Sequence, residues 1–155
     1  MRRNDREITE ISMIGSIFSD ADVCRVAFAD NNIPYIVTMN FGFILGERNV
    51  LYFHCAHEGR KIDMLRRNDN VCFELDTDHK LFEAKKACGW GMTFKSVVGF
   101  GKITIVEDPA ERVEALDLIM NHYGGGGNYD YDERQMIKTT ILRLDIKEMT
   151  GKQKK

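Results

Sequence analysis

The sequence has no strong excess of charge of either sign. Its 155 residues include 22 lysines and arginines against 24 aspartates and glutamates, for a formal net charge of −2. Proteins that bind nucleic acid or acidic membranes through global attraction carry a marked positive charge, which is missing here. We therefore expect neither nucleic acid nor a membrane among the partners.

Long apolar runs and paired cysteines are also missing. No apolar run approaches the ~20 residues that a bilayer-spanning helix needs. The opening "MRRNDREITE" has cations with no apolar segment behind them, unlike a secretory signal. The cysteines have no CxxC or zinc-like spacing: Cys24, Cys55, Cys72 and Cys88. These absences predict a cytoplasmic protein with reduced thiols and no metal site.

What is present is typical of a folded globular chain. Hydrophobic residues make up 43% of the sequence and charged residues 30%, which argues against disorder. The length suits one domain spanning 1–155. No internal repeat or low-complexity segment appears beyond the four glycines at 124–127.

Six segments have the alternation or the β-branched and aromatic content of strands: 23–29, 34–45, 50–56, 71–76, 96–107 and 139–149. Between the fourth and fifth, residues 77–94 are expected to be irregular. About six antiparallel strands with peripheral helices favour a mainly β (α+β) protein built on a small barrel. The tail, 150–155, is expected to be frayed.

Three helices are expected around these strands. Asp5 can cap an N-terminal helix within residues 1–20 that has Ile8 and Phe18 on its apolar face. A short helix is expected at 60–67. Asp108 and Pro109 give a clear start to a third helix, ending near Gly124.

The stretch "LYFHCAHEGRK" (51–61) carries the densest chemistry of the chain. Successive side chains of a strand point to opposite faces, so His54 and Cys55 cannot bind one metal ion together. A structural zinc site would need further ligands that no HxxxH or CxxC supplies. Cys55 as a nucleophile is a weak hypothesis, because catalytic Cys–His pairs are usually distant in sequence.

An anion site fits this stretch better. Gly59 allows a sharp turn from strand to helix, and Arg60 and Lys61 then lie at the helix N-terminus. Free N–H groups and the helix dipole favour a phosphate there. A solvated basic helix face explains the same residues equally well, so the residues alone leave both interpretations open.

Several ordered motifs carry a resemblance to a known family. "PYIVTMNFGF", "YFHCAHEGRK", "LRRNDNVCFELD" and "SVVGFGKITIVEDPAERVEAL" resemble the flavin-binding split-barrel proteins related to pyridoxamine 5'-phosphate oxidase. The opening "MRRNDREI" is similar to the nitroimidazole-resistance (Nim) branch. The resemblance runs from Met1 to about Ile146, and it implies a six-stranded antiparallel split β-barrel.

The resemblance also implies a cofactor and a partner. Flavin mononucleotide (FMN) would lie between the two subunits of a homodimer, with its phosphate near Arg60 and Lys61. Further cofactor contacts would come from two strands: Val37, Thr38, Met39 and Asn40, then Phe53, His54 and Cys55. His54 would lie near the reactive face of the flavin. The branch often has serine at Cys55 and proline at Thr38, so these two residues depart from its pattern.

The segment "CGWGMTFKS" (88–96) holds the single tryptophan. Trp90 is flanked by glycines, so it could anchor the core or form an aromatic wall of the cofactor cleft, and its loop-like context favours the wall. Ser96, at the end of this segment, is included with the cofactor-binding candidates. Gly99 and Gly101 would form a strip without side chains, where the strand bends or the flavin or the partner subunit approaches.

The resemblance therefore implies an FMN-dependent oxidoreductase that reduces a small substrate such as a nitroimidazole. His54 would orient the substrate or donate a proton, since imidazole exchanges protons near neutral pH. Two alternatives stay open. One is an oxidase of a pyridoxamine-phosphate-like amine, which would need a basic pocket beyond 60–67. The other is a flavin- or haem-binding module without turnover.

Overall fold

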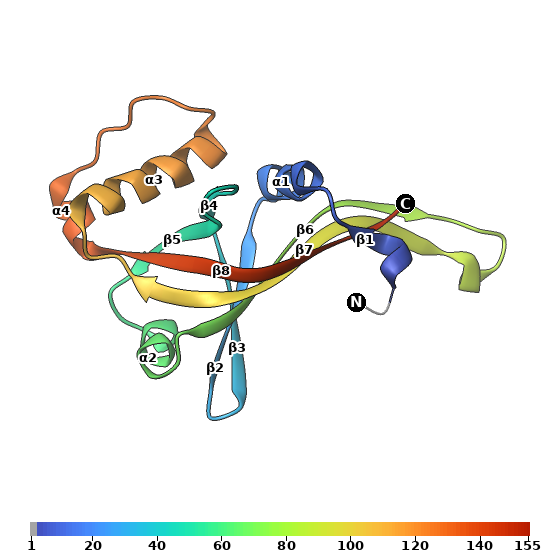
Figure 1. Ribbon diagram of the computed structural model, residues 1–155, viewed down its shortest axis with the longest axis horizontal. Coiled ribbons are helices and arrows are strands. Elements are labelled where there is room, and N and C mark those ends of the chain that lie inside the picture. The colour runs from blue at the N-terminus through green and yellow to red at the C-terminus, as the bar shows by residue number, and fades with distance from the viewer. Residues whose placement is uncertain (1–2) are drawn as a thin grey trace.

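A computed structural model describes residues 3–155, with eight strands in one sheet and helices outside it (Figure 1). The strands are β1 Glu7–Ile8, β2 Cys24–Asp30, β3 Ile33–Met39, β4 Phe41–Ile44, β5 Val50–Ala56, β6 Asn70–Phe82, β7 Gly91–Ile105 and β8 Thr139–Lys154. The helices are α1 Ile11–Asp20, α2 Arg60–Arg67, α3 Pro109–Gly124 and α4 Glu133–Lys138, with 3₁₀ turns at Asn4–Arg6 and Ala87–Gly89.

The sheet is antiparallel and its two edges are neighbours in sequence. Its strand order is β3-β2-β6-β7-β8-β5-β4, with β1 paired to β8. The edge strands β3 and β4 are joined by Asn40 alone, so the curled sheet is closed there by the chain rather than by strand pairing. The prediction of a mainly β, antiparallel split barrel is confirmed, with eight strands in place of six.

The extra strands come partly from the segment expected as one strand at 34–45. Met39 still pairs with Cys24 of β2, whereas Phe41 pairs with Phe53 of β5. The chain therefore changes partners at Asn40, and β3 and β4 belong to opposite edges of the sheet. This corner creates the split.

The N-terminal helix begins later than expected. Asp5 caps no helix and instead forms an ion pair with Arg3 at 2.6 Å. Ile8 lies in β1 opposite Gly151 of β8, and α1 starts at Ile11. Residues 1 and 2, the start of the expected segment, lie outside the described residues.

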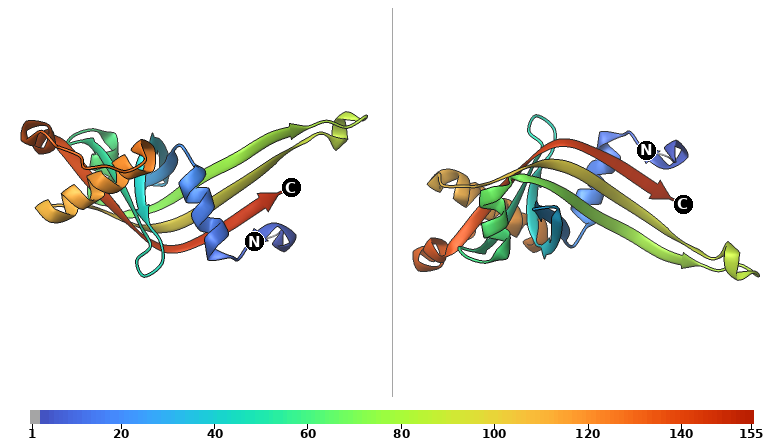
Figure 2. Two further views of the ribbon diagram at one scale, coloured as in Figure 1. Left: turned by 90° about the horizontal axis from the view of Figure 1, so that it is seen from above. Right: turned by 90° about the horizontal axis from the view of Figure 1, so that it is seen from below.

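Residues 77–94 form most of a long hairpin, not an irregular segment. β6 and β7 stay paired as far as Phe82 and Gly91, with a register shift after Thr77. Asp78 accommodates this shift with a positive φ of 61°. Figure 2 shows the hairpin, which we call the arm (residues 77–95), extending beyond the other strands. The tail at 150–154 is part of β8, paired with β7 and β1, so the expectation of a frayed end was wrong.

The core explains why β5 is apolar from Val50 to Phe53. Leu51 and Phe53 pack inside the barrel with Phe18 of α1, while Val50 and Tyr52 pack under α3. Both predicted later helices are confirmed: α2 has the expected bounds, and α3 is capped by the Asp108 carboxylate, which accepts from the Glu111 N–H at 2.8 Å.

Candidate functional site

The pairing of β5 with β4 ends at the pair Phe41–Phe53. From His54 to Ala56 it pairs with β8 alone among the described strands. The Asn49 carbonyl accepts from the Ile146 N–H at 2.9 Å, so odd-numbered residues of β5 direct their backbone groups to β8. The backbone N–H and C=O groups of His54 and Ala56 point away from β8, toward the side of the sheet where Asn40 follows β3.

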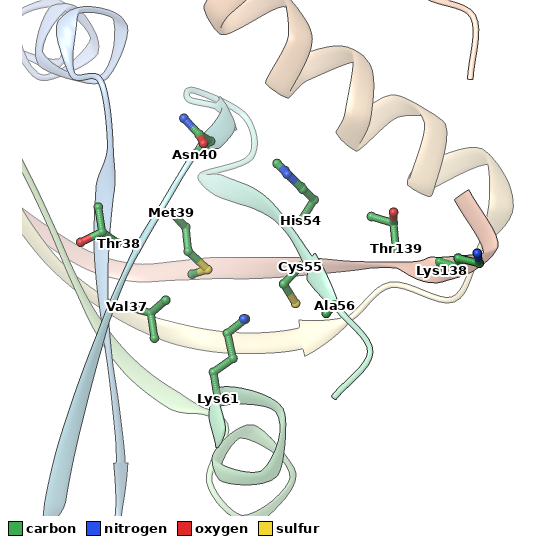
Figure 3. A pocket seen from close by; sticks show the side chains of 10 residues that line it. All are labelled: Val37, Thr38, Met39, Asn40, His54, Cys55, Ala56, Lys61, Lys138 and Thr139. Carbon is green, nitrogen blue, oxygen red and sulfur yellow. The ribbon is translucent and has the colours of Figure 1, made fainter. Parts of the chain in front are cut away.

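A cleft of about 480 Å³ lies at this place, within the usual size range of small-molecule sites. Figure 3 shows the ten side chains around it, which come from the end of β3, the end of β5, the first turn of α2 and the α4–β8 junction. They are Val37, Thr38, Met39, Asn40, His54, Cys55, Ala56, Lys61, Lys138 and Thr139. Seven of the eleven predicted cofactor-binding residues therefore line the cleft: Val37, Thr38, Met39, Asn40, His54, Cys55 and Lys61.

His54 and Cys55 point to opposite sides of β5, as strand alternation requires (Figure 3). His54 is exposed, and Cys55 is half-buried on the side of Lys61. Burial raises the pKa of the Cys55 thiol, and the Lys61 charge offsets this in part. Cys55 is therefore a neutral thiol near pH 7, which does not suit a nucleophile. Residues 3–155 contain no group of three His, Cys, Asp or Glu side chains placed to hold a metal ion.

The charges around the cleft have one sign. Lys61 and Lys138 line it, and none of the ten lining residues carries a carboxylate. Gly59 precedes α2 with a φ of 124° and no side-chain cap. Its carbonyl accepts from the N–H groups of Ile62 and Asp63, which leaves the first two N–H groups of α2 without an intrahelical acceptor. The cleft therefore favours an anion.

Arg60 and Phe53 lie beside the cleft and do not line it. The guanidinium of Arg60 sits 4.6 Å from the centre of the Tyr35 ring, in a cation–π contact. Phe53 is fully buried in the barrel core. Lys61 is thus the member of the predicted Arg60–Lys61 pair that faces the cleft.

Trp90 is in the arm and Ser96 follows it in β7, and neither residue lines the cleft of its own chain. Trp90 is 46% exposed near the tip, where its indole N–H donates to the Ala84 carbonyl at 2.8 Å. Ser96 lies within β7, between Asp76 of β6 and Lys152 of β8.

Lys138 and Thr139 were missed by sequence reasoning. They end α4 and begin β8, far in sequence from the other lining residues. The Asp132 carboxylate caps α4 by accepting from the N–H groups of Arg134 and Gln135, which was a readable signal for this helix. No local pattern could show that the helix ends at the cleft.

The fold and the cleft define a class: split-barrel proteins with an anion-favouring ligand site where the barrel splits. Residues 12–153 match the family described as pyridoxamine 5'-phosphate oxidase. The chain belongs to that family, and the resemblance seen in the sequence is confirmed.

Solved structures agree with this assignment. A candidate 5-nitroimidazole antibiotic resistance protein from Bacteroides thetaiotaomicron is 37% identical, with a TM-score of 0.81 over 94% of this chain and 85% of that chain. The flavocytochrome Anf3 from Azotobacter vinelandii has 18% identity and a TM-score of 0.81, over 100% of this chain and 72% of that chain.

A flavin adenine dinucleotide (FAD) and haem binding protein from Mycobacterium smegmatis has 15% identity and a TM-score of 0.84, over 97% of this chain and 74% of that chain. At these identities, the last two structures show the fold alone. A comparison with curated proteins gave no match. Among residues 3–155, no helix is long and apolar enough to cross a membrane.

Proposed function

We propose that this protein binds FMN in the cleft and reduces a small oxidised substrate such as a nitroimidazole. The observation that carries the proposal is the lining of the cleft, where Lys61 and the open end of α2 attract an anion and no carboxylate opposes it. The 37% identity to a candidate nitroimidazole resistance protein supports the substrate class.

The residues present fit FMN. The Lys61 ammonium and the free N–H groups of α2 suit a phosphate dianion. The backbone edge of His54 and Ala56, with the Asn40 amide, offers donors and acceptors to a polar ring edge. Val37 and Met39 add apolar surface for a flat ring system. Cys55, where the Nim branch often has serine, contributes a small apolar contact.

FMN, when bound, supplies the electron-transfer chemistry, while the protein positions and stabilises. His54 is the exposed titratable side chain at the end of β5, and its ring nitrogens can hold or donate a proton toward a substrate in the cleft. Lys61 would hold the phosphate end of the cofactor.

The visible absorbance spectrum of the purified protein, before and after addition of FMN, tests cofactor binding. We expect the absorbance bands of bound flavin and a binding curve that saturates with FMN. If neither is observed, the cleft does not bind FMN. The bound flavin is then reduced anaerobically with dithionite, and a 5-nitroimidazole is added. Return of the oxidised spectrum supports nitroreduction, and a flavin that stays reduced counts against it. Hydrogen peroxide formed from pyridoxamine 5'-phosphate in air would instead favour the amine oxidase.

We also propose that the protein is a homodimer. Four apolar side chains stand in register across β3, β2, β6 and β7 on the outer face of the sheet: Ile36, Ala27, Cys72 and Phe100. Ile36 is 64% exposed and Phe100 50%, an unusual exposure for a continuous row. A second copy would cover this row beside the cleft residues of β3.

Sedimentation velocity tests the dimer. We expect a dimer for the wild type and a monomer for Phe100→Glu, because the charge would be buried in the interface. Ile137→Glu is the matched control, since Ile137 is 74% exposed and lies outside the row; it should stay dimeric. A monomeric wild type, or a dimeric Phe100→Glu variant, would contradict this interface.

A further inference from the structure

The cleft has a second cation, and it comes from a different part of the fold than the first. Lys61 enters from α2, whereas Lys138 enters from the end of α4, on the other side of Cys55 and Ala56 (Figure 3). Lys138 is exposed, and it comes from an element that does not contact the phosphate position expected at Lys61 and α2. Neither lysine has an ion-pair partner within residues 3–155.

The backbone around Lys138 is held by side chains from two other elements. Nη2 of Arg112, on α3, donates to the carbonyls of Met136 at 2.7 Å and Thr139 at 2.9 Å. The His57 ring contacts the Ile137 carbonyl through Nε2 and the Thr140 hydroxyl through Nδ1. The carbonyls directly before and after Lys138 are therefore both occupied.

These contacts stabilise α4, which would not be a stable helix by itself. A helix of six residues is too short to be stable in isolation. The Asp132 cap and the bonds from Arg112 and His57 hold it in place. The backbone from which the exposed Lys138 side chain starts is thus fixed by the fold, so a ligand that binds there need not order this segment.

We infer that Lys138 is an anion subsite that binds a carboxylate of a small aromatic substrate, while Lys61 holds the cofactor phosphate. The inference rests on the proposed function, because it assigns the two cations of one cleft to two ligands. The subsite accounts for a positively charged lysine facing a cleft with no carboxylate in its lining. His54 lies between Asn40 and Thr139 in the view of the cleft (Figure 3).

Two probes of nearly identical shape test this inference: 4-nitrobenzoate, which is an anion, and 4-nitrobenzamide, which is neutral. Calorimetric titration of the FMN-loaded protein measures the dissociation constant of each. A charge-assisted hydrogen bond is stronger than a neutral one, so we expect the wild type to prefer the benzoate about tenfold, or about 1.4 kcal/mol. Lys138→Gln should abolish this preference, so that the two dissociation constants become about equal, and Lys138→Arg should keep it.

The matched control is Arg134→Gln, which removes one positive charge from the same helix at an exposed position that does not line the cleft. It should keep the preference for benzoate. Equal binding of the two probes by the wild type would overturn the inference, and so would a preference that survives in Lys138→Gln. A loss of preference in both variants would show a general charge effect and would also refute the subsite.

Failure of the proposed function would be seen separately. The visible spectrum reports whether flavin is bound, and the ratio of the two dissociation constants can be measured on the protein with or without it. A protein that takes no FMN but loses its benzoate preference in Lys138→Gln would refute the cofactor and support the subsite. A protein that binds FMN and does not distinguish the probes would do the reverse.

Discussion

Replacement of Arg112 by alanine should release α4 from the body of the protein. Arg112 is half-buried and donates to two carbonyls, those of Met136 and Thr139. Hydrogen bonds from a charged donor contribute about 1.5–3 kcal/mol each. With both bonds at the low end, because the guanidinium is partly exposed, Arg112→Ala should lower the free energy of opening α4 by about 3 kcal/mol.

Native-state hydrogen exchange measures this opening. Since each 1.4 kcal/mol is a factor of ten, the amides of residues 136–139 should exchange about 100-fold faster in Arg112→Ala. Arg134→Ala is the control, because Arg134 is exposed on the same helix and its side chain makes no hydrogen bond within residues 3–155. Equal exchange at 136–139 in both variants would refute the reasoning that Arg112 holds this segment.

Two further predictions concern stability. The buried Tyr52 hydroxyl donates to Glu111 at 2.9 Å, and burial, with this hydrogen bond, raises the pKa of Tyr52 to about 12 from an ordinary 10. The unfolded chain therefore loses this proton first, so up to about 3 kcal/mol of stability is present below pH 10 and lost toward pH 12. Urea titrations at pH 9 and pH 11.5 should show a larger loss for the wild type than for Tyr52→Phe; equal losses would contradict the assignment. Gly42→Ala places a methyl group 2.6 Å from the backbone nitrogen of Ile119 on α3, which should cost about 1–3 kcal/mol. Gly15→Ala is the control and should not destabilise the protein, because nothing lies within 4 Å of the added methyl group. If Gly42→Ala were as stable as Gly15→Ala, β4 and α3 would be able to separate freely.

The strands and helices that are defined by their own sequence were predicted well. The first four residues of β5, Val50 to Phe53, are apolar, and the residues at 60–67 form α2 with the predicted bounds. The Asp108–Pro109 start of α3 is a local signal that depends on no distant partner. Such elements are set by periodicity and capping, which the sequence displays directly.

The elements that were mispredicted depend on distant partners. Residues 79–82 look irregular by composition, yet they are strand because β7 pairs with them. Ile8 fits a helical pattern, but Gly151 of β8 holds it in a strand. The break at Asn40 exists because the barrel ends there and the chain must pass from one edge to the other.

The candidate site shows the same division. Strand alternation separated His54 from Cys55 correctly, and the turn at Gly59 identified the segment that brings Lys61 to the cleft. Lys138 could not be found in this way, because the end of α4 is held at the cleft by hydrogen bonds from Arg112, which is distant in sequence. Whether Arg60 or Lys61 faces the cleft also depended on a distant residue, Tyr35.

The central claim is that the cleft binds FMN with its phosphate at Lys61. Titration of the wild type and of Lys61→Gln with FMN and with riboflavin, which lacks the phosphate, tests it most directly. We predict that Lys61→Gln weakens FMN binding by about 10- to 100-fold, the equivalent of one charge-assisted hydrogen bond, and changes riboflavin binding little. Arg60→Gln, next to it on α2 but stacked on Tyr35, should change the FMN affinity much less. Equal losses for both ligands in Lys61→Gln, or a wild type that binds neither, would contradict the account.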